Sequence, residues 1–178
     1  EVNAQDALFA GLSSLGYLAP GGSVRTYDST GVELGHFGAY GSGDGQFTAP
    51  YGLAVDSQGR TYVADTENNR VVRFHADGTF GRNFDAASTG FADFAAPYDV
   101  AVDRRGNFYV SMHAAHVVAQ FSANGTHLGT FGGPGAGDSE FAAPRGLEWT
   151  PANELVVADT GNARVQRWSP GGNFQGYV

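Results

Sequence analysis

The strongest constraint on the fold of this 178-residue chain is a ten-residue segment that occurs three times, at intervals of 47 residues. It reads FTAPYGLAVD at 47–56, FAAPYDVAVD at 94–103 and FAAPRGLEWT at 141–150. A repeat of fixed length predicts similar structural units that stack side by side and share a core with their neighbours. The repeat holds from about residue 24 to the last residue and weakens before that.

Each repeat predicts four short strands. YGLAVD, RTYVAD and RVVRFH are rich in β-branched and aromatic residues. The polar stretches SQG, TENN and ADG follow them in that order and are typical of turns and loops. The fourth strand is clearest as THLGTFG at 126–132. Four antiparallel strands in a repeat of this length predict one blade of a β-propeller.

We therefore predict an all-β chain, a β-propeller of four-stranded antiparallel blades that forms a single domain over 1–178. About four blades fit the repeat, with a degenerate or partial blade in 1–49 and further blades in 50–96, 97–143 and 144–178. The sequence leaves three arrangements open: a piece of a larger propeller, a small four-bladed ring, or an incomplete arc that closes by pairing with other chains. An open arc would expose strand edges and apolar faces, which favours an oligomer.

The segment FGAYGSGDGQFTAPYGLAVDSQGRTYVADTENNRVVRF resembles the NHL repeat family, and the resemblance extends over about 32–178. The elements P-x-G-L-A-V-D, Y-V-A-D-T and N-x-R-V occur in that order and in more than one copy. The resemblance implies a propeller, usually of six blades, whose innermost strand begins at the proline. We accordingly expect Phe47 to pack between neighbouring blades and Pro50 to stiffen the start of the strand.

Charge and composition argue against several kinds of partner. The net charge is −8, and all ten cationic residues are arginine. Some animal NHL domains bind RNA on a basic face, so an acidic, lysine-free chain is expected to bind no nucleic acid. No apolar run approaches the roughly 20 residues that span a bilayer, so we expect no membrane insertion. The absence of cysteine excludes disulfides and thiolate metal sites.

An acidic, lysine-free surface also suits an extracellular or cell-surface setting, although a GC-rich genome would produce the same bias. Asn124 begins an N-x-T triplet in a predicted turn, which is an acceptor for glycosylation only in a suitable secretory pathway.

Charged residues at equivalent repeat positions predict structural ion pairs. Asp65 and Arg70 occur again as Asp159 and Arg164, whereas the middle repeat has apolar residues at both positions. Losing both charges together avoids an unpaired, partly buried charge. We therefore predict two ion pairs across the loop between the second and third strands of a blade, and metal coordination by these carboxylates is the weaker alternative.

Two pairs of residues are candidate metal ligands. The middle repeat carries His113 and His116 in the loop SMHAAHVV, a spacing that suits zinc if a third ligand exists. The alternative interpretation is that they are two histidines on the surface of the protein. Asp56 and Asp103 end their inner strands, where they could face the channel and bind calcium. Capping of the following turn is the favoured interpretation for these two aspartates.

The residue after the repeated proline is the best candidate for recognition. It is Tyr51, Tyr98 and Arg145 in the three copies, and these residue types dominate binding hot spots. Ordinary packing between blades is the alternative. The resemblance extends to the NHL-like peptidyl-hydroxyglycine lyases, which carry a zinc-binding histidine at this position. This chain has no histidine there, so the resemblance does not support lyase chemistry. His113 is added to this candidate binding site because it lies in the loop that departs from the pattern.

These observations favour a non-catalytic module. The first hypothesis is a platform that binds a protein, peptide or glycan, or a structural unit that assembles with copies of itself. The alternative is a metal-dependent lyase or hydrolase with its site at the channel, which would need His113 or His116 to converge with carboxylates of other blades. No nucleophile motif or pair of catalytic carboxylates is recognisable, so an enzyme is the less favoured of the two.

Overall fold

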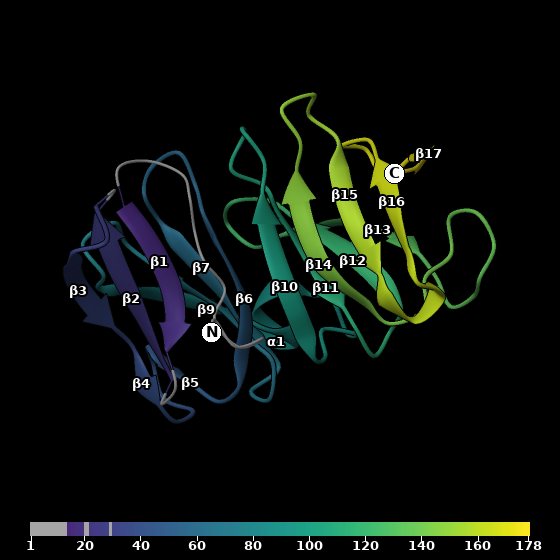
Figure 1. The fold of residues 1–178 in the computed structure, drawn as a ribbon. Coiled ribbons are helices and arrows are strands. Elements are labelled where there is room, and N and C mark those ends of the chain that lie inside the picture. Colours follow the sequence, from purple (N-terminus) through teal and green to yellow (C-terminus); the bar gives the residue numbers. More distant parts are fainter. Residues whose placement is uncertain (1–13, 20–21, 29) are drawn as a thin grey trace.

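The computed structural model describes residues 14–19, 22–28 and 30–178, and its strands form four consecutive antiparallel sheets besides one short parallel pair in a connection (Figure 1). Within every sheet the strands neighbour one another in chain order. The strands are β1 (Ser14–Ala19), β2 (Ser23–Asp28) and β3 (Glu33–Phe37); β6 (Pro50–Val55), β7 (Thr61–Asp65), β8 (Arg70–Phe74) and β9 (Phe80–Phe84); β10 (Pro97–Val102), β11 (Phe108–Met112), β12 (Val117–Phe121) and β13 (His127–Gly132); and β14 (Pro144–Trp149), β15 (Leu155–Asp159), β16 (Arg164–Trp168) and β17 (Phe174–Tyr177).

The predicted all-β architecture of four-stranded antiparallel sheets is therefore confirmed, with a three-stranded sheet at the amino-terminal side. Of the degenerate or partial blade predicted in 1–49, residues 1–13, 20, 21 and 29 lie outside the described residues. Two short helices occur in connections, α1 (Ala86–Thr89) and the 3₁₀ turn η1 (Thr160–Asn162). No helix in the described part of the chain is long and apolar enough to cross a membrane.

The hydrophobic core lies between successive sheets. One buried cluster joins Val24 of the first sheet to Leu53 and Phe74 of the second. A second cluster joins Tyr62 and Phe84 to strands β10–β12, and a third joins β10–β13 to strands β14–β16. None of these clusters joins the first sheet to the last across the described residues. The four sheets form an arc, with β1–β3 and β14–β17 at its two ends (Figure 1).

Phe47 packs between the first two sheets, as expected. Its side chain is fully buried within the cluster that contains Val24 and Leu53. The ring closes so tightly over Gly38 that a Cβ on that glycine would lie 2.4 Å from a ring carbon. Gly38 also has φ +84°, so this position requires glycine on two counts. Phe141 stands in the same relation to Gly132, whose Cβ would lie 2.2 Å from its ring.

The glycine-rich connections to the inner strands are explained by this contact. In the first connection, β4 (Ala39–Tyr40) and β5 (Gln46–Phe47) pair in parallel, and an isolated parallel bridge joins Pro134 and Phe141 at the third. The middle connection contains α1 instead, capped by Asp85. Each connection delivers a buried phenylalanine and then the proline that begins β6, β10 or β14.

Candidate functional site

The three inner strands β6, β10 and β14 begin at the same end of the arc, which we call the proline end. The connections between sheets and the loops that follow β7, β11 and β15 also lie there, because the strands of each sheet are antiparallel. The opposite end, which we call the turn end, carries the tight turns at 56–59, 103–106 and 150–153.

The residues that follow the three prolines form a stack at the proline end. The rings of Tyr51 and Tyr98 are stacked, with centroids 4.7 Å apart and planes 12° apart. The Arg145 guanidinium carbon lies 5.1 Å from the centre of the Tyr98 ring, within the range of a cation–π contact. We call Tyr51, Tyr98 and Arg145 the ladder, because each of three consecutive inner strands contributes one member. Both tyrosines are half-buried, and Arg145 is exposed.

His113 borders the ladder. Its ring centroid lies 5.6 Å from that of Tyr98, and the ring is half-buried. Burial and the positive charge of Arg145 lower the pKa of His113, so its imidazole is neutral at pH 7. The structure thus brings together all four residues that the sequence nominated for binding. The packing alternative is also realised, because the same contacts join neighbouring sheets while leaving Arg145 in solvent.

His116 has a structural contact that weakens the zinc hypothesis. Its Nδ1 accepts a hydrogen bond of 2.8 Å from the backbone N–H of Ala143 in the next connection. Asn69, 47 residues earlier, accepts an equivalent bond of 2.8 Å from Ala96. Both residues have left-handed backbone angles, φ 58° and 51°. His116 therefore replaces an asparagine that ties one blade to the next, and no group of three metal-binding side chains exists among the described residues.

Replacing His116 with asparagine should be neutral or slightly stabilising, because asparagine tolerates a positive φ and already makes this bond at residue 69. Replacing it with alanine should lower the free energy of unfolding by about 1–3 kcal/mol, because the Ala143 N–H loses its acceptor. Urea unfolding of both variants measures this. A zinc-dependent rise in melting temperature that vanishes in His116→Asn would contradict the structural role.

The two charge pairs that the repeats singled out are present. Arg70 Nε donates to Asp65 Oδ2 at 2.8 Å, and the carboxylate is fully buried. Arg164 Nε donates to Asp159 Oδ2 at 2.7 Å. The far side of each guanidinium donates to carbonyl oxygens of the preceding connection, those of Gly43 and Gln46 in the case of Arg70. Each pair therefore fastens a loop to the connection that leads into its own blade.

Burial and hydrogen bonding act in opposite directions on Asp159. Burial alone would raise its pKa, but hydrogen bonds from the Ala142 N–H and from Asn162, Arg164 and Gln166 outweigh it and leave the pKa lowered. The carboxylate is thus ionised and fully used by protein donors, which favours a structural role over metal coordination.

Comparison with known proteins agrees with the repeat pattern. The sequence profile of the NHL repeat matches residues 47–74, which contain β6, β7 and β8. Residues 47–74 thus form an NHL repeat. Protein lin-41 of Caenorhabditis elegans is 47% identical over 58 residues, which are 32% of this chain and 5% of that protein. The E3 ubiquitin-protein ligase TRIM71 of Rattus norvegicus is 40% identical over 58 residues, 33% of this chain and 7% of that protein.

Solved structures agree with a β-propeller fold. A streptogramin B lyase structure superposes with a TM-score of 0.73 at 15% identity, covering 98% of this chain and 54% of that one. A virginiamycin B lyase from Staphylococcus aureus gives 0.72 at 14% identity, covering 97% and 55%. The chain thus spans about half the length of these structures and a small fraction of its curated relatives. The predicted propeller is confirmed, and identities this low show the fold alone.

The two aspartates considered for calcium cap the turns that follow β6 and β10. Asp56 Oδ1 accepts from the backbone N–H groups of Gln58 and Arg60, and its Oδ2 pairs with Arg60 Nε at 2.6 Å. Asp103 Oδ1 accepts from the N–H groups of Arg105 and Asn107, and its Oδ2 from the Asn107 amide. Every carboxylate oxygen of both residues has a protein donor, so the structure agrees with turn capping.

Asp99 is a residue that sequence reasoning missed. It stands where the other two inner strands have Gly52 and Gly146, and a Cβ on Gly52 would lie 1.9 Å from its Oδ1. Its Oδ2 accepts a 2.8 Å bond from the Leu147 N–H on β14. The carboxyl therefore sits between three inner strands. Burial raises its pKa to about 7, against the opposing effect of the Leu147 and Val100 N–H donors. The sequence signal that could have identified this residue is that position 99 is aspartate where the other two repeats have glycine.

Proposed function

We propose that this NHL propeller is a non-catalytic binding module that recognises a protein or peptide segment at its proline end. The observation that carries the proposal is the ladder: its three residues come from three separate blades, and Tyr51 and Arg145 lie 4.7 Å and 5.1 Å from the ring of Tyr98. A surface that is already ordered loses little conformational entropy when a partner binds.

The chemistry of the ladder fits a peptide. Half-buried tyrosine rings held by stacking offer rigid apolar area, and aromatic residues and arginine are enriched among binding hot spots. Exposed Arg145 offers a planar fork of donors for a carboxylate. Neutral His113 beside Tyr98 adds a polar group without adding charge. A segment that combines an aromatic or proline side chain with an acidic one matches these groups.

Self-assembly through the last blade is less well supported. The 47-residue register makes Glu148 equivalent to Ala54 and Ala101, which are buried at 8% and 5% exposure where a following sheet packs. Val165 and Val178 are exposed on the same sheet at 37% and 81%. Burying that face against a second copy would therefore bury a carboxylate, which is costly unless the copy supplies a partner for it.

The proposal is tested by displaying a random peptide library against the immobilised chain. The selected peptides are then compared on the parent and on a Tyr51→Ala/Arg145→Ala protein. Affinities of the selected peptides are then measured by calorimetry. Arg145→Ala should weaken binding at least about tenfold, the size of a hot-spot contact. Arg82→Ala on outer strand β9 is the matched control and should leave affinity unchanged.

Two results would overturn the proposal. One is that the selected peptides bind the double variant as tightly as the parent. The other is that light scattering finds a discrete oligomer whose dissociation, rather than peptide binding, responds to these variants. Glycans are tested in parallel on an array with the same variants.

A further inference from the structure

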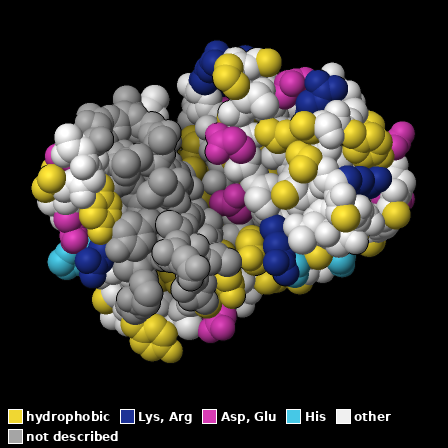
Figure 2. Space-filling view, viewed as in Figure 1, with side chains coloured by type: hydrophobic (Ala, Val, Ile, Leu, Met, Phe, Trp, Pro, Cys, Tyr) yellow, Lys and Arg dark blue, Asp and Glu magenta, His cyan; other side chains and the backbone are white. Residues whose placement is uncertain are grey.

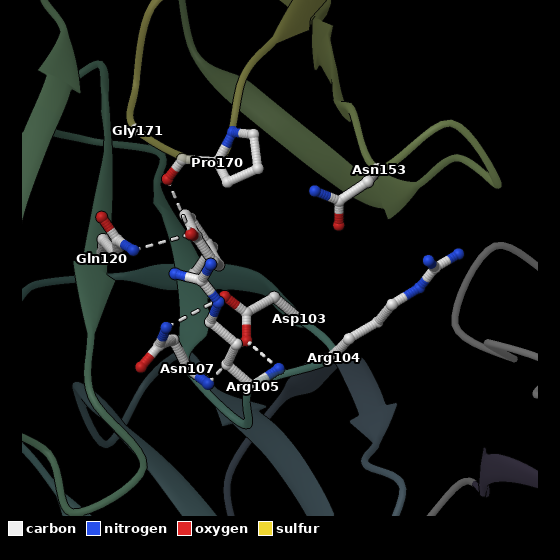
Figure 3. Close-up of a pocket in the computed structure, with 9 residues that line it drawn as sticks. Asp103, Arg104, Arg105, Asn107, Gln120, Asn153, Pro170 and Gly171 are labelled. Atoms are coloured by element: carbon white, nitrogen blue, oxygen red, sulfur yellow. Dashed lines mark hydrogen bonds between the residues drawn. The ribbon is translucent and has the colours of Figure 1, made fainter.

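The described residues line a half-open cavity at the turn end, between the third and fourth sheets and away from the ladder. Its volume is about 510 Å³, and its walls include Asp103, Asn107, Tyr109, Gln120 and Asn153. Figure 3 shows Asn153 and Arg104 on one side of the cavity and Gln120 and Pro170 on the other. The volume lies within the usual range of small-molecule sites, about 300–1,000 Å³.

The preceding junction, between the second and third sheets, shows why the cavity exists. The 47-residue register makes Asn107 equivalent to Arg60, and Gln120 equivalent to Arg73. Arg60 pairs with Asp56 at 2.6 Å and reaches to 3.6 Å from the Cβ position of Gly106 in the next sheet. Arg73 crosses the same junction and donates to the Ala123 carbonyl at 3.0 Å. Two long arginine side chains thus fill the junction between the second and third sheets. The shorter amides of Asn107 and Gln120 leave the junction between the third and fourth sheets open.

The surroundings of the cavity are held in place by hydrogen bonds. Tyr109 Oη accepts a 2.6 Å bond from Gln120 Nε2 and donates a 2.9 Å bond to the Pro170 carbonyl. Asp103 is fixed by its turn and by Asn107 Nδ2 at 3.0 Å (Figure 3). The buried Tyr109 ring also packs edge-on against Trp149, with centroids 5.0 Å apart. A pocket with polar groups already fixed is suited to a small polar ligand.

Two arginine side chains lie at the mouth of the cavity. Arg104 and Arg105 occupy the turn positions of Ser57 and Gln58 in the preceding repeat. Arg104 Nη2 donates to the Pro151 carbonyl at 3.2 Å. The Arg105 guanidinium has no hydrogen bond or ion pair within the described residues, and both side chains line the cavity. On a chain of net charge −8, this is a local cationic mouth.

We propose that this cavity binds a small organic acid of sugar size. The carboxylate is held at the mouth by Arg105, whose planar fork matches a carboxylate in bidentate geometry. The hydroxyl groups of the ligand face the Asn107 and Asn153 amides. The proposal is independent of peptide recognition at the proline end, because the two surfaces share no residue.

The test uses D-galacturonate as the acidic probe, with D-galactose as its uncharged match and inorganic phosphate as a simple anion. Binding is followed by ¹H–¹⁵N NMR titration of the whole chain. We expect galacturonate to bind with a dissociation constant of about 1 mM or tighter and galactose at least tenfold more weakly. Shifts should be centred on residues 103–107 and 153.

Two variants are copied from the preceding repeat. Asn107→Arg/Gln120→Arg refills the cavity as Arg60 and Arg73 fill its counterpart, and should weaken galacturonate binding at least tenfold. Arg105→Gln copies exposed Gln58 and should remove the preference for galacturonate over galactose without lowering the melting temperature. Equal binding of galacturonate and galactose, unchanged binding by either folded variant, or phosphate binding as tight as galacturonate would each overturn the proposal.

Discussion

Replacing Asp65 with methionine should lower the free energy of unfolding by about 3–5 kcal/mol, the largest effect expected from one substitution in this chain. Asp65 is fully buried, and its Oδ2 accepts from Arg70 Nε at 2.8 Å and from Asn68 at 2.8 Å. Its Oδ1 accepts from the Thr48 N–H at 2.7 Å. Removing the carboxylate leaves the Arg70 guanidinium, whose side chain is only 9% exposed, buried without its counter-charge.

The double variant Asp65→Met/Arg70→Val should recover much of that loss. The middle repeat already carries Met112 and Val117 at these positions, and the two residues pair directly within a regular sheet. A double-mutant cycle measured by urea unfolding should give a coupling of at least about 2 kcal/mol. Recovery will be incomplete because the Thr48 N–H still lacks its acceptor. Additive losses in the two single variants would show that the pair is not energetically coupled.

The sequence predicted the sheets well because the repeat carries the same information several times. A 47-residue register fixes which positions face the preceding sheet and which face the next. Because Phe47 and Phe141 are equivalent in this register, both could be predicted to be buried, as they are. The paired loss of charge at Met112 and Val117 identified the ion pairs for the same reason. The ladder was also found this way, because equivalent inner-strand positions must meet around one axis.

Two features that the sequence alone did not reveal involve side chains that act across a junction between blades. His116 was considered as a metal ligand because its sequence neighbours gave no sign that it accepts from Ala143 in the next connection. The turn-end cavity was not predicted because it exists only where the short side chains of Asn107 and Gln120 leave the junction between two sheets unfilled. A comparison of Arg60 with Asn107 and of Arg73 with Gln120 would have revealed it, but only once the shared junction was known.

The free energy of unfolding should rise by about 2–3 kcal/mol from Asp99 alone when the pH is lowered from 8 to 5. Burial raises the pKa of this carboxyl from 3.8 to about 7 in the folded protein. Folding therefore favours the protonated form, and its stabilising contribution is complete below about pH 4. That contribution is lost as the pH rises from there through 7, because the unfolded chain ionises first. The direction is opposite to that of Asp159, whose lowered pKa makes its contribution disappear only under acid.

The measurement is urea unfolding at pH 5 and pH 8 for the parent and for Asp99→Asn, which keeps the shape of the side chain and cannot ionise. His113, whose pKa is lowered by burial, opposes the trend by disfavouring folding below about pH 6.5, so the difference between the two proteins is the quantity to compare. The variant loses one acceptor at every pH, that for the Leu147 or the Val100 N–H. A parent and variant with the same change between pH 5 and pH 8 would show that Asp99 does not titrate in this range. A steeper fall in the parent would establish that the inner strands meet around a carboxyl that is half ionised near neutral pH.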